Sequence, residues 1–573
     1  MELKTVDIII ILAFFIITLA IGLAVSKKAG KSSSEFFLSG RNMPWWLLGV
    51  SMVATTFAAD TPNLVAGIVR KNGIAGNWEW WAFLLTGMLT VFIYARLWRR
   101  LGISTDLEFY EIRYQGKIAA FLRGFRAIYL GVIFNIIVMA TVCLAGIKIG
   151  HVILGLEAWE TLTITGVITV IYSLLGGLKG VILTDFFQFI VAMVGSIWAA
   201  YFIIDMPEIG GMDGLLSQEA VREKLDLIPD RMNNYDLWMS VFLIPLAVQW
   251  WSAWYPGAEP GGGGYIAQRM LAAKDEKHAT AATLFFNFAH YALRPWPWII
   301  IALASIVLFP EIADLENAFP GLTDSFYKDD LAYPAMLTYL PAGLLGLVLA
   351  SLISAFMSTI STHLNWGSSY VVNDYYKRFV KPDATEKQLV RVGRISTALM
   401  MLFAALLSLV LEEAKAAFDL IILVGAGTGL LFILRWFWKA INPYSEMVAM
   451  IISFLVAVLF FILGKMGVDM SLPVKLSISV GLTSLAWIVA TLLTQDEKYL
   501  NPEFEKRAFD NDGKFKNMGY KVLSIFLGSI AIYAALFCIG NYLLGNNMQA
   551  LYFGIAFVLG SIGIAAFWKK LFE

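Results

Sequence analysis

The chain has 573 residues, of which 59% are hydrophobic and only 15% are charged. A soluble protein of this size carries far more charge, so this composition and a mean hydropathy of +0.70 indicate a polytopic membrane protein. The formal net charge is zero, which gives no indication of a nucleic acid or other polyanionic partner. Cys143 and Cys538 both lie in apolar segments, so neither a disulfide framework nor a cysteine-based metal site is expected.

About fifteen segments are long and apolar enough to cross a bilayer. Because lipid offers the backbone no hydrogen-bond partners, these segments are predicted to be helices. Their approximate limits are 5–26, 44–69, 78–100, 126–150, 158–177, 180–204, 236–255, 280–308, 335–363, 390–412, 417–438, 445–465, 473–493, 519–541 and 549–570.

Lysine and arginine are distributed unevenly among the connecting loops. The loops 205–236 and 309–333 are rich in aspartate and glutamate, whereas alternate loops are basic. The positive-inside rule therefore predicts an external N-terminus and a cytoplasmic C-terminus in the cell membrane. The basic loop residues counted here include Lys27, Lys28, Lys31, Arg99, Arg100, Arg269, Lys274, Lys277, Lys377 and Arg378.

A run of hydroxyl side chains lies in the segment 335–363. In a helix, Ala355, Ser358, Thr359 and Thr362 fall at i, i+3, i+4 and i+7 and share one face. Neutral oxygens on one face suit a hard monovalent cation such as sodium. Serine and threonine in membrane helices also bond to backbone or to neighbouring helices, and spacing alone leaves both interpretations open.

The segment 44–69 is interrupted by Ala58-Ala-Asp-Thr-Pro-Asn63. Pro62 removes a backbone donor and clashes with the preceding turn, so carbonyl groups near it lose their helical partners. Asp60 is costly at membrane depth unless it is paired or faces a wet cavity. The pattern predicts an ion or substrate site at a broken helix; a kinked helix with a buried, protonated Asp60 is the alternative.

A second break is predicted after Gln249-Trp-Trp-Ser-Ala-Trp-Tyr-Pro256, before Gly261 to Gly264. Aromatic faces beside an amide can stack against and hydrogen-bond a small polar solute, although an interfacial aromatic belt has the same composition. The glycine run lacks the strand and lysine of a phosphate-binding loop, which argues against a nucleotide site. The candidate substrate residues near the two breaks are Asn63, Gln249, Trp250 and Trp254.

The two breaks fall in the first and sixth of ten segments, as a five-plus-five inverted repeat requires. We therefore expect an N-terminal helix and loop (1–43), two repeats of five helices (44–205 and 206–440) and accessory C-terminal helices (441–573).

Another polar group enters the membrane after a predicted tight turn at Gly176 and Gly177. Asp185 and Gln188 then lie about one turn apart on one helix face. A second intramembrane carboxylate suggests cation chemistry; Asp185 pairing or capping near the interface is the alternative.

The sequence resembles the sodium:solute symporter family, which includes bacterial sodium/sugar and sodium/proline symporters. The resemblance covers about residues 5–440 and rests on several motifs in order. These motifs are Asp106 to Tyr114, Gly176-Gly-Leu-Lys-Gly-Val-Ile-Leu-Thr-Asp-Phe-Phe-Gln188, Gln268-Arg-Met-Leu-Ala-Ala-Lys274, Tyr333-Pro334 and Ala355-Phe-Met-Ser-Thr359.

The resemblance implies an all-α membrane fold, a LeuT-type five-plus-five inverted repeat with one extra N-terminal helix. Together with the later segments it implies about four extra C-terminal helices. It also implies a sodium site between the first and eighth core helices. Carried over, the implied sodium residues are the Ala58, Thr61 and Ala355 carbonyls, the Ser358 and Thr359 hydroxyls, and Asp185 near the ion's exit route.

Glu79 looks like the glutamate that touches the solute in the sugar branch, whereas Asp60 is similar to the carboxylate of the proline branch. The expected function is therefore sodium-coupled import of a small polar solute, a sugar or an amino acid, by alternating access. Proton coupling through Asp60 or Asp185, and a non-transporting membrane sensor on the same fold, are the alternatives. No enzyme is expected, because the four histidines form no His-x-x-x-His pair and no nucleophile motif is present.

Overall fold

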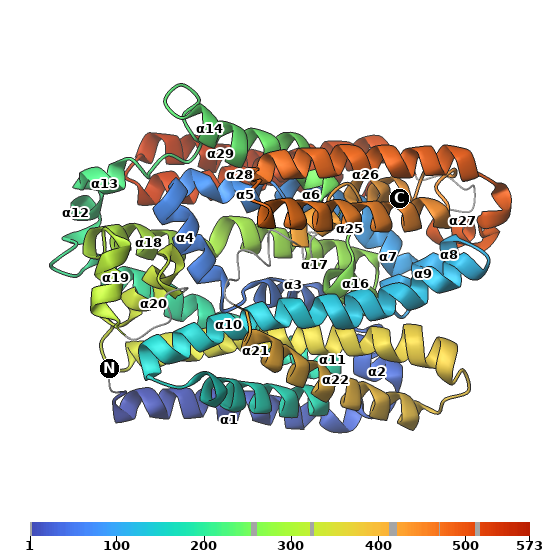
Figure 1. The fold of residues 1–573 in the computed structure, drawn as a ribbon, viewed down its shortest axis with the longest axis horizontal. Coiled ribbons are helices and arrows are strands. Elements are labelled where there is room, and N and C mark those ends of the chain that lie inside the picture. Colours follow the sequence, from blue (N-terminus) through green and yellow to red (C-terminus); the bar gives the residue numbers. More distant parts are fainter. Residues whose placement is uncertain (1–2, 254–259, 321–325, 412–420, 469, 510–515) are drawn as a thin grey trace.

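The computed structural model describes residues 3–253, 260–320, 326–411, 421–468, 470–509 and 516–573. Within these ranges the chain is helical, and the only β-structure is two isolated bridges. The long helices run roughly along the longest axis of the molecule (Figure 1). Eleven described helices are long and apolar enough to cross a membrane, or twelve if one bent pair is counted as a span.

The first half of the chain contains a 47-residue helical segment, α11, about 70 Å long at 1.5 Å per residue. That is more than twice the bilayer core, and α11 is divided at Gly177, whose φ of 51° and ψ of −161° are not helical. A Cβ at Gly177 would lie 2.7 Å from the Phe36 carbonyl oxygen, so the chain requires glycine there. α11 thus accounts for two of the predicted segments, joined at the predicted turn. The helices are α1 (Thr5–Ala29), α2 (Ser33–Leu38), α3 (Trp45–Thr56), α4 (Thr61–Asn72), α5 (Trp78–Trp81), α6 (Leu84–Leu89), η3 (Thr90–Tyr94), α7 (Ala95–Leu101), η4 (Asp106–Glu108), α8 (Phe109–Arg113), α9 (Lys117–Ile128), η5 (Tyr129–Phe134), α10 (Asn135–Leu154) and α11 (Ala158–Ile204).

The second half continues with shorter helices around one long buried helix, α21. Four helices long enough to span follow residue 440, namely α25, α26, α28 and α29. The elements are α12 (Gly211–Ser217), α13 (Glu219–Arg222), α14 (Tyr235–Leu237), η6 (Trp238–Leu243), η7 (Pro245–Gln249), α15 (Trp250–Ser252), α16 (Gly264–Ala272), α17 (Glu276–Phe288), η8 (Ala289–Leu293), α18 (Trp296–Leu308), α19 (Ile312–Ala318), η10 (Asp329–Leu331), α20 (Ala332–Leu337), α21 (Leu344–Tyr370), η11 (Val371–Val380), α22 (Glu386–Ser408), α24 (Gly429–Leu434), α25 (Pro443–Lys465), α26 (Leu472–Thr494), α27 (Pro502–Ala508), α28 (Met518–Leu543) and α29 (Asn547–Phe567).

The first predicted helix break is present. α3 ends at Thr56, α4 begins at Thr61, and the two axes are bent by 59°. Pro62 lies in the first turn of α4, where a missing N–H costs nothing. At the second predicted break, α15 ends at Ser252 and α16 begins at Gly264, and residues 254–259 between them lie outside the described residues.

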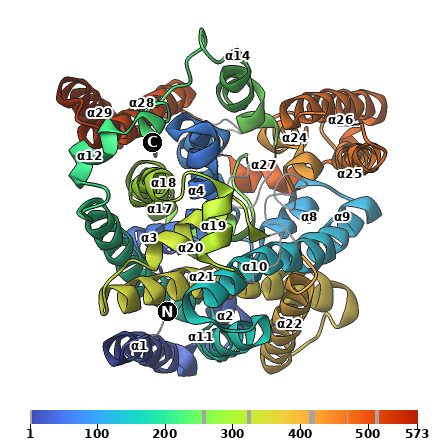
Figure 2. The same cartoon turned by 60° about the vertical axis from the view of Figure 1, so that its left-hand side comes forward.

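α21 lies at the centre of the molecule, packed against α11, α1, α10, α22 and α3 (Figure 2). Nearly every residue of α21 is buried, including its serines and threonines. A helix that is buried all round has no lipid-facing stripe, so its polar side chains must find partners inside the protein.

The short helices α12, α13, α19 and α20 gather at the end of the molecule where the N-terminus lies, and α8 and α27 lie at the other end (Figure 1). The predicted acidic loops therefore share an end with the N-terminus, and which end faces the cytoplasm stays a prediction. One loop residue was assigned wrongly. Arg269 lies inside α16 and is fully buried, so it does not contribute a loop charge.

Candidate functional site

One buried carboxylate joins three helices at the centre of the protein. The Ser358 hydroxyl on α21 donates to Asp185 Oδ1 at 2.6 Å, and the Ser51 hydroxyl on α3 donates to Asp185 Oδ2 at 2.5 Å. All three side chains are almost completely buried. Both oxygens of Asp185 therefore accept hydrogen bonds inside the protein, and its depth relative to the membrane interface stays a prediction.

The hydroxyl face of α21 lies against the last turn of α3. The Thr359 hydroxyl donates to the Thr55 carbonyl at 2.8 Å, and the Thr55 and Thr362 hydroxyls are 2.9 Å apart. Ala355 is 3% exposed on the same buried helix. The face inferred from helical spacing is therefore the one that meets the broken helix.

A buried arginine completes this cluster. Arg269 on α16 donates to the Thr362 hydroxyl at 2.6 Å and to the Ser51 hydroxyl at 3.2 Å, and its Nη2 lies 3.8 Å from Asp185 Oδ2. An ion pair with no solvent exposure needs such extra hydrogen bonds to offset its desolvation. Sequence reasoning missed Ser51, Thr55 and Arg269, although the four-residue spacing of Ser51 and Thr55 places them on one helix face.

The end of α3 offers carbonyl oxygens beside the hydroxyl face. The Thr56 carbonyl accepts a hydrogen bond from Arg294, and the Phe57 carbonyl contacts no donor among the described residues. The C-terminal end of a helix carries partial negative charge, which favours a cation.

The two residues assigned to sodium on the first core helix lie at this break. The Ala58 carbonyl accepts the Thr61 N–H at 3.1 Å. The hydrogen bond from Thr359 reaches Thr55, about one turn earlier, so the assignment of the Ala58 and Thr61 carbonyls stays a prediction.

The candidate substrate residues are partly brought together. Gln249 Nε2 donates to the Glu79 carbonyl at 2.9 Å, and the Thr86 hydroxyl donates to the Trp250 carbonyl. Asn63 is 3% exposed, and its side-chain oxygen has no hydrogen-bond partner among the described residues. Trp254 lies outside the described residues.

These features define a helical membrane transporter with two broken helices and a buried polar site between them. Residues 36–453 match the model of the sodium:solute symporter family. The chain therefore belongs to the sodium:solute symporter family. It is a transporter and not an enzyme, and sodium is its coupling ion.

Curated relatives cover most of the chain. The sodium/glucose cotransporter of Vibrio parahaemolyticus is 26% identical over 467 residues, which are 79% of this chain and 84% of that protein. Sodium/glucose cotransporter 1 of Oryctolagus cuniculus is 26% identical over 79% of this chain and 71% of that protein. The sodium/myo-inositol cotransporter of Canis lupus familiaris is 28% identical over 77% of this chain and 64% of that protein.

A solved structure has the same fold. The substrate-bound outward-open state of a Na⁺-coupled sialic acid symporter matches with a TM-score of 0.70 and 21% sequence identity. The match covers 86% of this chain and 99% of that one. The predicted LeuT-type fold is thus confirmed.

Proposed function

We propose that this symporter imports a sugar or a related polyol together with sodium. The placement of the ion site is supported by the contact between the hydroxyl face of α21 and the broken end of α3. There sodium binds to the Ser358 and Thr359 hydroxyls, the Ala355 carbonyl and carbonyls at the break, with Asp185 supplying negative charge beside it. The named substrates of the relatives, glucose and myo-inositol, support a neutral polyhydroxylated solute.

The solute binds beside the ion, between the two breaks. Gln249 and Glu79 belong to elements that meet there, and the tryptophans at 250 and 254 supply aromatic faces for stacking. An amino acid is the second candidate, because Asp60 and Arg294 place both signs of charge at the first break.

Coupling follows from the position of the ion site. Sodium bound between α21 and α3 stabilises the arrangement in which the two elements are in contact, and the solute stabilises the same arrangement. The membrane potential contributes about 2.3 kcal/mol per sodium ion per 100 mV. Neutral hydroxyl and carbonyl ligands leave the ion free to dissociate on the other side.

The test is uptake into proteoliposomes that contain the purified full chain. An inward sodium gradient is imposed, radiolabelled sugars, polyols and amino acids are screened, and a potassium gradient and protein-free liposomes serve as controls. Accumulation of glucose or myo-inositol only with external sodium is the expected result. Accumulation of amino acids alone would replace the sugar with the second candidate, and uptake driven by a proton gradient without sodium would overturn the assigned coupling.

A further inference from the structure

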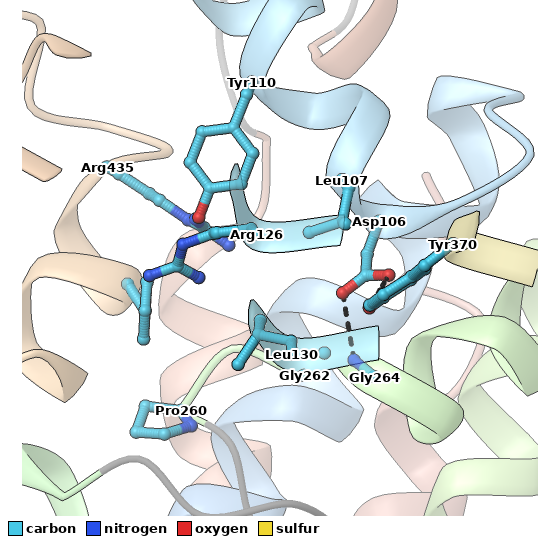
Figure 3. A pocket seen from close by; sticks show the side chains of 12 residues that line it. Asp106, Leu107, Tyr110, Arg126, Leu130, Pro260, Gly262, Gly264, Tyr370 and Arg435 are labelled. Carbon is cyan, nitrogen blue, oxygen red and sulfur yellow. Dashed lines mark hydrogen bonds between the residues drawn. The ribbon is translucent and has the colours of Figure 1, made fainter. Parts of the chain in front are cut away.

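The glycine run of the second break lines a small cavity between the beginning of α16, the η4–α9 region and the end of α24 (Figure 3). The cavity is about 20 Å³, enough for one water-sized occupant. Its charged lining residues are Asp106, Arg126 and Arg435. It is separate from the cluster around Asp185, which shares none of its lining residues.

The glycines expose backbone donors at this cavity. Gly261, Gly262 and Gly264 have φ values of 80°, 76° and 56°, which other residues rarely adopt. A Cβ at Gly262 would approach Met270 to 2.8 Å. No acceptor among the described residues contacts the N–H groups of Gly262 and Gly263, which lead into the positive end of α16.

Two buried guanidinium groups face the same space (Figure 3). Arg126 and Arg435 are each 7% exposed. Arg435 forms an ion pair with Glu446 at 3.4 Å and donates to the Tyr110 hydroxyl at 3.0 Å.

Arg126 is the unusual member of this pair. Its Nε donates to the Met450 sulfur at 3.1 Å, and its guanidinium lies over the Tyr110 and Phe432 rings. No carboxylate in the described part of the chain lies within ion-pair distance of it, and its terminal NH₂ groups have no protein acceptor there. A largely buried cation without a counter-ion is disfavoured, which favours an anion beside Arg126.

Two arginines, Arg126 and Arg435, and one carboxylate, Asp106, line the cavity, and Glu446 pairs with Arg435. Arg126 is therefore the cation of this group that has no ion-pair partner among the described residues. Asp106 does not repel an anion strongly, because its oxygens already accept from the Tyr370 hydroxyl and from the Gly264 N–H at 3.0 Å.

We propose that this cavity binds a monatomic halide, of which chloride is the abundant one. The one-water volume favours chloride over phosphate, sulfate or an organic acid, which are larger. The halide is held by the Arg126 guanidinium and the N–H groups of the glycine run, and it joins α16 to α9 and α24. The binding site does not depend on which solute the protein carries.

The test uses the purified full chain in detergent at a fixed sodium concentration. Chloride is exchanged stepwise for gluconate, and the melting temperature is recorded for wild type, Arg126→Ala and the control Arg391→Ala, which removes an exposed charge. Wild type and R391A are expected to melt at higher temperature as chloride or bromide rises, with saturation. Arg126→Ala is expected to require about tenfold more chloride or to lose the response, because a charge-assisted hydrogen bond is lost.

Sodium titrations in gluconate keep this result separate from the ion site of the proposed function, since the sodium response is expected to persist in R126A. Anomalous diffraction from wild-type crystals grown in bromide gives a second readout that needs no variant. A bromide peak beside Arg126 supports the site. Identical melting in chloride and gluconate, an unchanged chloride response in R126A, or density for water alone at this position would overturn the proposal.

Discussion

At the scale of single residues, the Thr359 hydroxyl is the group that tests whether the polar face of α21 binds sodium or only forms structural hydrogen bonds. It bonds the Thr55 carbonyl on the facing helix, whereas the nearby Ser361 hydroxyl bonds the Ser358 carbonyl of its own helix. Thr359→Ala removes a hydroxyl and a methyl group, whereas Ser361→Ala removes a hydroxyl alone, so Ser361→Ala controls for the loss of a buried hydroxyl on this helix.

We expect Thr359→Ala to raise the half-saturating sodium concentration by about tenfold or more while the fold is retained, because one neutral oxygen ligand is lost. Sodium-dependent shifts in melting temperature provide the measurement. Ser361→Ala serves as the control and should retain wild-type sodium dependence. Equal behaviour of the two variants would remove Thr359 from the sodium site.

The Arg269–Asp185 pair is predicted to matter for stability as well. Arg269→Met leaves the fully buried Asp185 without its cation, and breaking a buried pair from one side typically costs about 3–5 kcal/mol. The double variant Arg269→Met/Asp185→Asn should recover part of this loss. Denaturant unfolding of the single and double variants measures the coupling, and strictly additive effects would show that the two side chains do not stabilise each other.

The site residues that the sequence revealed are those defined by local spacing. Helical periodicity placed Ser358, Thr359 and Thr362 on one face. Thr359 and Thr362 bond Thr55 on α3, and Ser358 bonds Asp185 on α11. Arg269 was not recognised, because its pairing with Asp185 joins segments distant in sequence and its charged neighbours made the stretch look like a loop. Local patterns carry no information about such long-range partners.

At the scale of elements, η10 connects two helices that belong to different parts of the fold. Asp329 pairs with Arg70 at the end of α4 at 2.9 Å, and Asp330 pairs with Lys148 on α10 at 3.1 Å. The cationic partners are almost buried, at 4% and 5% side-chain exposure. We infer that opening of the protein at this end separates α4 from α10, a movement that these ion pairs oppose.

We therefore expect Asp330→Asn to increase the open population at this end. A cysteine at Gly67 on α4, whose Cβ would lie 3.5 Å from the Asp330 backbone nitrogen, reports opening through thiol labelling. In a background lacking Cys143 and Cys538, the labelling rate of Gly67→Cys should rise when Asp330→Asn is added. An unchanged rate would show that the Lys148 pair does not hold this end closed.

The opposite end contains an ion-pair network that predicts a pH dependence. Burial raises the pKa of Glu111 on α8, but hydrogen bonds from Arg378 and Arg123 outweigh this effect and the pKa lies below its ordinary value. A lowered folded-state pKa contributes stability above the unfolded value, and this contribution is lost as the pH falls through the folded value. The stability that Glu111 contributes is therefore lost at and below about pH 4.3.

Glu111→Gln should lower the melting temperature at pH 7 and reduce the further loss of stability below about pH 4.3. Melting temperatures from pH 7 down to about pH 3 test this, with Glu223→Gln, which changes an exposed carboxylate, as the control. Parallel pH profiles for wild type and E111Q would contradict the assignment.

Element positions were predictable where one residue type dictates the backbone. Pro62 marked the beginning of α4, and Gly177 marked the division of α11. The π-helical turns η6 and η7 within the predicted segment 236–255 were not foreseen, because a π-turn depends on what packs beside the helix and not on one residue.

At the scale of the whole molecule, the C-terminal helices form two separate groups. α28 and α29 lie together at one edge, and α25 and α26 lie at another (Figure 2). α28 packs against α5, which follows the first break in the sequence. The Tyr533 hydroxyl on α28 donates to the Trp81 carbonyl on α5 at 2.9 Å. The sequence identified these helices as accessory but not which part of the core each one contacts, because their apolar surfaces are alike in composition.

The closest helix contact in this region leads to a last prediction. A Cβ at Gly540 on α28 would overlap the buried ring of Trp296 at the start of α18, whereas a Cβ at Gly519 on the same helix meets nothing. Gly540→Ala is therefore expected to destabilise the protein by about 1–3 kcal/mol through overpacking, and Gly519→Ala to leave it unchanged or slightly more stable. Thermal unfolding compares the two variants, and sodium titrations show whether the ion site is affected. Arg294, which bonds the Thr56 carbonyl, lies two residues before α18. Separation of α28 from α18 should therefore also weaken sodium binding if α28 moves together with the broken helix during transport. A destabilised G540A protein with wild-type sodium affinity would instead identify α28 as a passive support.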